Sequence, residues 1–256
     1  MDYVTEAGFH LKEVSLSSYL GIQGWVLLHY LKLVFWPSPL VFDYGRPHLM
    51  ASETALAWVI ILFLLGLTLW AYRRRNPLGF CGIWFFLILA PTSLIPLSDF
   101  IVEHRMYLPL MAPVILFVVG IHRIVRSKTL RIFVLASTIL VLGLLTVQRN
   151  VDYQTAVSIW KDTVSKQPRH PRAYANLGAA LHAEGRLREA LLAYRVSLLL
   201  DPQQPDVYSN VGYALENLGD LNGARRQYEK ALQLQPGHRK AAGNLSGLIQ
   251  KISSSP

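Results

Sequence analysis

A cluster of charged and hydroxyl-bearing side chains lies between two apolar stretches of this 256-residue chain. The segment Pro96–Pro109 reads PLSDFIVEHRMYLP and carries Asp99, Glu103, His104, Arg105 and Tyr107. A guanidinium group matches phosphate oxygens with two parallel hydrogen bonds, so Arg105 is a candidate ligand for a lipid-linked phosphate. Glu103 is a candidate to orient that arginine. The alternative is an ordinary loop whose charges meet headgroups and water.

A second polar segment, WPSPLVFDYGRP, covers residues 36–47. Asp43 and Tyr44 lie in it beside Arg46, and aromatic side chains accompany them. Aromatic residues at the ends of apolar stretches form belts at the membrane interface, which is the competing interpretation. The sequence has no glycine-rich phosphate loop, paired-cysteine metal site or nucleophile elbow. We therefore predict no metal site and no cofactor, and we assign no catalytic residue.

The elements that must hold these two segments are apolar. Hydrophobic residues make up 52% of the chain and charged residues 16%, against about 25% charged residues in soluble proteins. Thr54–Tyr72 and Pro77–Ser98 contain no charge, while Met106–Ile121 and Ile132–Val147 are shorter and flanked by arginines whose stems can reach the headgroups. The sequence predicts four transmembrane helices within residues 53–148 and excludes a soluble enzyme.

Residues 1–52 are predicted to form an N-terminal segment with one further helix and an external loop. The stretch Leu16–Trp36 is apolar overall but contains Gln23, His29 and Lys32. Acidic flanks on both sides favour a helix that begins and ends on the non-cytoplasmic face of the membrane, as an interfacial or re-entrant helix does. A full transmembrane span is the alternative.

The basic residues of the apolar half determine its topology. Seven of them lie in two short loops, Arg73–Arg75 and Arg123–Arg131, which the positive-inside rule places in the cytoplasm. Everything after Val147 then faces the periplasm or the secretory lumen. We expect a multi-pass protein of the bacterial inner membrane, or of the endoplasmic reticulum membrane in a eukaryote. The other charges are scattered, so the net charge of +9 does not predict a nucleic-acid partner.

A sequence pattern recurs every 34 residues within residues 149–256. Asn176-Leu177-Gly178 recurs as Asn210-Val211-Gly212, and Tyr194 and Tyr228 have the same spacing. This pattern resembles the tetratricopeptide repeat, a pair of packed helices. We predict a half repeat over 153–168, full repeats over 171–204 and 205–238, and a capping helix over 240–252. The flanking helices bring the array close to the three repeats that a continuous core needs. The predicted fold class is therefore all-α: membrane helices followed by a short α-solenoid.

The first helix of each repeat lines a concave surface in such solenoids, where a peptide or protein segment binds. The residues projected onto this groove are Arg172, Asn176, His182, Asp206, Asn210 and Tyr213. Basic residues that clamp a C-terminal carboxylate in other repeats are missing here. Their places are taken by Ala175, Ala179, Ser209 and Tyr213. A spacer that packs against its own membrane half is the alternative to a binding surface.

Both polar segments, followed by a last span that leads directly into the repeats, resemble the transmembrane and tetratricopeptide-repeat O-mannosyltransferase family and its bacterial relatives. Members of that family are multi-spanning glycosyltransferases of the GT-C type with a polyprenyl-phosphate sugar donor, and they hold their repeats on the lumenal or periplasmic side. The resemblance implies contacts to the donor lipid for Glu103, Arg105 and Tyr107. It places Asp43 and Tyr44 near the same cavity. The catalytic acidic residues of those enzymes lie in a first external loop, and this chain starts after that region, so we expect the C-terminal portion of such a protein.

Two hypotheses of different class follow. The first is a membrane-anchored repeat protein with a periplasmic or lumenal protein-interaction module and no catalysis by this chain alone. The second is a glycosyltransferase, or one part of a split one, that uses a polyprenyl-phosphate-linked sugar to modify proteins. An assembly or quality-control factor for envelope proteins has the same sequence features as the first. The expected partners are the lipid bilayer, a protein or peptide in the groove and, under the second hypothesis, the lipid-linked sugar.

Overall fold

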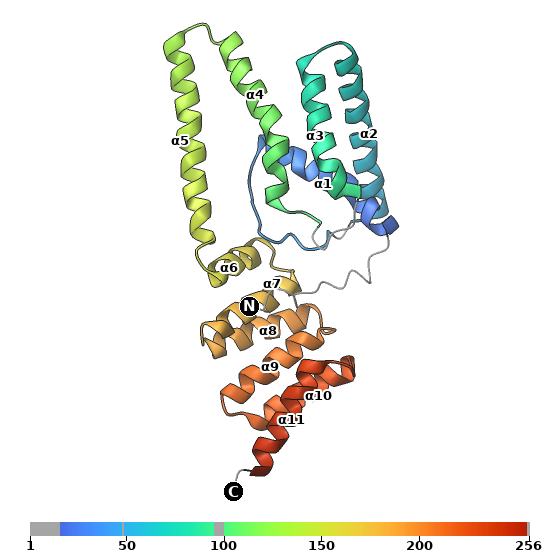
Figure 1. The fold of residues 1–256 in the computed structure, drawn as a ribbon, viewed down its shortest axis with the longest axis vertical. Coiled ribbons are helices and arrows are strands. Elements are labelled where there is room, and N and C mark those ends of the chain that lie inside the picture. The colour runs from blue at the N-terminus through green and yellow to red at the C-terminus, as the bar shows by residue number, and fades with distance from the viewer. Residues whose placement is uncertain (1–15, 48, 95–99, 255–256) are drawn as a thin grey trace. The chain divides into compact units, whose positions relative to one another are not determined.

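The computed structural model describes residues 16–47, 49–94 and 100–254. All regular elements within these ranges are helices (Figure 1), which confirms the predicted all-α class. The chain divides into two compact units, with the boundary between Val147 and Gln148.

The helices of the first unit are α1 (Leu16–Phe35), α2 (Ala51–Arg73), α3 (Pro77–Leu94), the short 3-10 helix η2 (Glu103–Met106), α4 (Tyr107–Ile124) and most of α5 (Lys128–Asp152). Four segments are long and apolar enough to cross a membrane: α2, α3, η2 together with α4, and α5. This confirms the predicted number of spans by length and composition. Most side chains of α2 to α5 are not buried in the protein, and α5 has no buried residue, as expected for helices whose apolar surface is covered by lipid. The predicted end of the second span, Ser98, lies outside the described residues.

Helix α1 is not among the four candidate spans. It packs on α2 and α3 through residues spaced three or four apart. These buried hydrophobic residues are Tyr19, Ile22, Val26, Leu27, Tyr30 and Leu33. Polar contacts fix both neighbours: the Tyr19 hydroxyl donates to the Thr92 carbonyl on α3 at 2.7 Å, and Trp58 Nε1 on α2 donates to the Gly21 carbonyl at 3.0 Å. Whether α1 lies in the interface or enters the membrane stays a prediction.

The second unit is a stack of helices, each packed on the next, which Figure 1 shows from yellow to red. They are α6 (Ala156–Lys166), α7 (Pro171–Ala183), α8 (Leu187–Leu200), α9 (Pro205–Asn217), α10 (Leu221–Leu234) and α11 (Arg239–Ser254). The pairs α7–α8 and α9–α10 fall within the two predicted full repeats. Helices α6 and α11 flank them, and α11 extends one residue before and two residues after the predicted capping helix.

The same close contact holds both repeats together. A Cβ atom placed on Gly178 would lie 2.5 Å from the ring of Tyr194, and one on Gly212 would lie 2.6 Å from the ring of Tyr228. Both tyrosines are fully buried. Because the rings leave no room for a side chain, only glycine lets the two helices of a repeat approach this closely. Glycine and tyrosine therefore recur every 34 residues because the two helices of each repeat must pack closely.

Candidate functional site

The first polar segment folds as a short helix at the start of a span. Helix η2 begins at Glu103 and leads directly into α4, whose first residue is Tyr107. Arg105 Nη1 donates to the Phe100 carbonyl at 3.3 Å, and the Tyr107 side chain is 75% exposed. Asp99 lies outside the described residues.

Helix α1 connects this segment to the second one. The Tyr30 hydroxyl contacts both backbone polar groups of Val102, accepting from the amide at 2.8 Å and lying 3.2 Å from the carbonyl. The ring of the adjacent His29 meets the ring of Tyr44 edge-on, with centroids 4.9 Å apart. Two adjacent residues of α1 thus contact both polar segments: His29 contacts Tyr44, and Tyr30 contacts Val102 just before η2. These contacts could not be predicted from the sequence.

The acidic residue of the second segment shapes its own loop. Asp43 is 8% exposed, and its Oδ1 accepts from the Gly45 amide at 2.9 Å. The Tyr44 hydroxyl accepts from the Val41 amide at 3.2 Å and donates to the Pro39 carbonyl at 3.3 Å. Contacts of this kind position a loop and do not identify a ligand.

The five residues proposed to contact a donor lipid keep that role as a prediction. A cavity of about 370 Å³ beside α1 adds Ser18, Arg46 and Thr54 to the polar groups of this region. Of these three residues, only Arg46 belongs to a polar segment that was singled out from the sequence.

The residues predicted to line a groove of the repeats lie on α7 and α9, and the start of α11 contacts them. His182 of the first repeat stacks on Tyr213 of the second, with ring centroids 5.1 Å apart and planes 19° from parallel. Burial lowers the pKa of His182, and the nearby charge of Lys240 lowers it further. The imidazole is therefore neutral near pH 7.

Lys240 contacts one of the predicted groove residues and was not singled out from the sequence. Its Nζ donates to Asn210 Oδ1 at 3.0 Å. Lys240 follows Asp206 by one repeat period and Arg172 by two. Extending the repeat register into the capping helix would therefore have found it. Together with His182 and Tyr213, Asn210 and Lys240 form a polar and aromatic cluster that spans three helices.

Asp206 takes part in a different contact. Its Oδ1 lies 2.9 Å from His238 Nε2, and His238 Nδ1 accepts the amide of Ala241 at 3.1 Å. Because Nδ1 accepts, Nε2 carries the proton and donates to Asp206. His238 therefore caps the N-terminus of α11 with its side chain. The remaining predicted groove residues, Arg172 and Asn176, are half-buried on α7.

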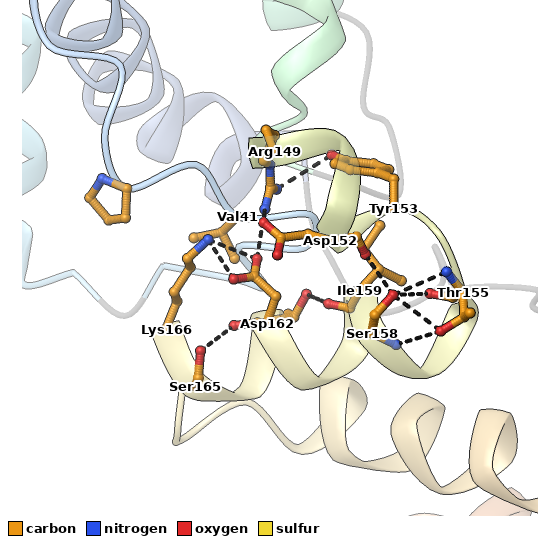
Figure 2. A network of polar contacts seen from close by, with 12 residues as sticks. Val41, Arg149, Asp152, Tyr153, Thr155, Ser158, Ile159, Asp162, Ser165 and Lys166 are labelled. Carbon is orange, nitrogen blue, oxygen red and sulfur yellow. Dashed lines mark hydrogen bonds and ion pairs between the residues drawn. The ribbon is translucent and has the colours of Figure 1, made fainter. Parts of the chain in front are cut away.

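A network of ion pairs fixes the end of α5 to α6, as Figure 2 shows. Arg149 Nη1 lies 2.7 Å from Asp162 Oδ2 and 3.0 Å from Asp152 Oδ2. Its guanidinium carbon lies 4.9 Å from the centroid of the Tyr153 ring, and Lys166 Nζ lies 2.6 Å from Asp162 Oδ1. The Arg149 and Asp162 side chains are only 14% and 13% exposed, so this pair is shielded from water. No residue of this network was singled out from the sequence.

The helix pairs and their glycine–tyrosine contacts define a tetratricopeptide-repeat solenoid. A family model described as tetratricopeptide repeat matches residues 205–238, and a second, described as TPR repeat, matches residues 178–219. The chain is thus a protein with candidate membrane helices followed by tetratricopeptide repeats.

Two proteins of Drosophila melanogaster are similar to this chain. One is described as protein O-mannosyl-transferase Tmtc3 and is 33% identical over 122 residues, which cover 45% of this chain and 13% of the relative. The other, protein O-mannosyl-transferase Tmtc1, is 33% identical over 103 residues, which cover 38% of this chain and 12% of the relative. The chain thus matches only a small part of each relative's length. These matches confirm the resemblance to the C-terminal portion of the transmembrane and tetratricopeptide-repeat O-mannosyltransferases.

Solved repeat structures are also similar to the chain. The first TPR of Spaghetti (RPAP3) bound to an HSP90 peptide is 22% identical, with a TM-score of 0.37, and the match covers 38% of this chain and 78% of that chain. The second TPR domain of human RPAP3 in complex with an HSP70 peptide is 25% identical, with a TM-score of 0.37, and the match covers 40% and 84%.

Proposed function

We propose that this chain is a membrane-anchored repeat protein whose tetratricopeptide repeats bind a protein or peptide segment on the periplasmic or lumenal side. The observation that carries the proposal is the cluster of His182, Tyr213, Asn210 and Lys240. These side chains come from the first helices of the two repeats and from the capping helix α11, and they interact with one another. Aromatic side chains with polar groups around them are the residue types that supply most of the binding energy at protein interfaces.

The chemistry of the cluster suits an extended peptide. Tyr213 is 46% exposed, so its ring offers apolar area to a ligand although one face is covered by His182. Lys240, whose ammonium group donates to Asn210 and acts electrostatically on His182, adds one positive charge to the cluster. A backbone carbonyl or an acidic side chain of the peptide would accept from this ammonium group, while an apolar side chain packs on Tyr213.

The side of the membrane follows from charge. The basic loops after the first and third candidate spans lie on the cytoplasmic side by the positive-inside rule. The repeats follow the fourth span and therefore lie on the opposite side. The repeats of the O-mannosyltransferase family are expected on this side too.

Site-specific crosslinking in intact membranes tests the binding surface. A photoreactive residue at position 213 should form adducts with a protein partner. The same residue at position 199 is the matched control, because Leu199 lies on the second helix of the first repeat and is 83% exposed. Adducts of equal yield from both positions, or none from position 213, would contradict a binding role for the groove.

A second candidate function is participation in sugar transfer from a polyprenyl-phosphate donor. It is supported by the 33% identity to proteins described as O-mannosyl-transferases and by the place of Arg105 directly before α4. Mannose transfer from a polyprenyl-phosphate donor to a protein acceptor should be lost in Arg105→Ala and kept in Arg126→Ala, a matched charge loss in another loop. A purified chain without any transfer would leave the first function alone.

A further inference from the structure

A cavity at the loop between α2 and α3 is lined by none of the residues of the sites described above. Its volume is about 500 Å³. The residues that line it are Tyr72, Arg73, Arg75, Asn76, Pro77 and Phe80. The three consecutive arginines of this loop, Arg73 to Arg75, predicted only a role in membrane topology.

The backbone of Arg75 is strained. Its φ angle is 54°, in the left-handed region that side chains other than glycine rarely adopt. The position is the residue just after the last turn of α2, where the Arg75 amide donates to the Tyr72 carbonyl and the Asn76 amide to the Ala71 carbonyl. Glycine or asparagine fits this position with less strain. Strained residues cluster at functional sites, so the presence of an arginine here calls for a role of its side chain.

The charges of the loop are divided between two environments. Arg73 and Arg75 line the cavity, whereas the Arg74 guanidinium carbon lies 5.9 Å from the centroid of the Trp70 ring. The sequence has no Asp or Glu from Thr54 to Ser98. No ion pair involves these three arginines within the described ranges. Arg73 and Arg75 thus border a cavity with no acidic partner among the residues that the structure describes.

The apolar part of the cavity points to a lipid as the source of that counter-charge. Tyr72 and Phe80 are more than half exposed, and they belong to two helices that are candidate membrane spans. Free phosphate would leave these rings without a partner, whereas a phospholipid satisfies both parts. We propose that this cavity binds an anionic phospholipid, with its phosphate held by Arg73 and Arg75 and its chains packed along Tyr72 and Phe80.

Lipid binding to the purified full chain in detergent tests this proposal. Phosphatidylglycerol should bind more tightly than phosphatidylcholine with the same acyl chains, as measured by native mass spectrometry over a lipid titration. Arg73→Gln and Arg75→Gln should each weaken phosphatidylglycerol binding by about tenfold, because each removes a charge-assisted pair of hydrogen bonds. Arg74→Gln is the matched control, because it removes the same charge from the same loop but not from the cavity. Phosphatidylglycerol binding to this variant should be nearly unchanged.

A fourth variant separates lost binding from lost folding. Arg75→Gly removes the guanidinium and also relieves the left-handed backbone, so the thermal midpoint of the lipid-free chain should rise while phosphatidylglycerol binding weakens. Equal binding of the two lipids, or equal losses in Arg74→Gln and Arg75→Gln, would overturn the proposal. Complete competition by inorganic phosphate at equal concentration would identify a free-anion site and would overturn it too.

Discussion

The imidazole of His182 stacks on the phenol ring of Tyr213, so a side chain of the first repeat covers an aromatic residue of the second. Lys240 of the capping helix is close enough to disfavour a positive charge on that imidazole. The residues predicted to line the groove therefore interact across α7, α9 and α11, and the pKa of His182 depends on how these helices pack.

The stability of the repeats should depend on pH through His182. Its pKa lies below the ordinary 6.5, first because of burial and second because of Lys240, whereas the unfolded imidazole keeps the ordinary value. Between the folded and the unfolded pKa the folded chain binds fewer protons. The free energy of unfolding should therefore fall as the pH drops below 6.5.

Chemical denaturation of the wild type and of His182→Gln over a range of pH measures this contribution. The variant should lose less stability on acidification, and the same slope for both proteins would be evidence against the contribution. In a nuclear magnetic resonance titration, Lys240→Gln should raise the pKa of His182 but keep it below 6.5, because burial persists.

Alanine at either close-contact glycine should destabilise the repeats. Gly178→Ala and Gly212→Ala place a methyl group against the rings of Tyr194 and Tyr228, and overpacking of this kind costs about 1–3 kcal/mol. Gly243→Ala in α11 is the control, because nothing lies within 4 Å of an added Cβ there. The control should raise the free energy of unfolding by up to about 1 kcal/mol, since alanine is the better helix former. A similar sign at all three positions in denaturant titrations would refute the packing argument.

Removing the cap of α11 should loosen that helix selectively. His238→Ala deletes the acceptor for the Ala241 amide and the donor to Asp206, and the loss of an N-cap costs about 1 kcal/mol. Hydrogen exchange should become faster in α11 and stay unchanged in α7. His238→Asn supplies a new amide oxygen as acceptor and should restore part of the protection. Uniform acceleration along the repeats would indicate general destabilisation in place of a capping role.

The ion pairs at the end of α5 should contribute more to stability than a comparable surface pair. Arg149→Met leaves Asp162 shielded with Lys166 as its remaining partner, and the cost should be about 3 kcal/mol. Arg186→Met breaks the pairs with Glu184 and Glu189, which are exposed to water, and should cost much less than Arg149→Met. Thermal or denaturant unfolding of the two variants compares them. Equal losses in the free energy of unfolding would show that the burial of Arg149 does not strengthen its ion pair.

The side on which the repeats lie can be measured directly. Cys81 is the sole cysteine of the sequence, so a Cys81→Ala background leaves one thiol after Ser254→Cys. A membrane-impermeant maleimide should label that thiol in sealed cells or vesicles from the periplasmic or lumenal side. Residue 126, in the loop predicted to be cytoplasmic, is the control position for Arg126→Cys. Labelling of position 126 but not of position 254 would reverse the orientation.

Much of the fold could be predicted because it depends on local patterns. Long uncharged stretches predict spans, and the recurrence of Gly178 and Tyr194 at Gly212 and Tyr228 predicts paired helices. The groove was only partly predictable. His182 and Tyr213 were placed on it from the repeat register, but Lys240 was missed because the capping helix lacks most of the repeat pattern.

The contacts that set the chemistry of each site join residues that are distant in the chain. His238 follows Asp206 by 32 positions, and Tyr30 precedes Val102 by 72. No periodicity predicts such pairs, because they depend on the angle at which whole helices cross. By itself the amino-acid sequence determined the helices, their repeat period and the number of candidate spans, all of which follow from hydrophobicity and side-chain size at short range. Only the tertiary structure decided that His238 caps α11, that Arg75 adopts a left-handed conformation just after α2 and that two arginines border a cavity. Each of these depends on backbone geometry and on which surfaces meet.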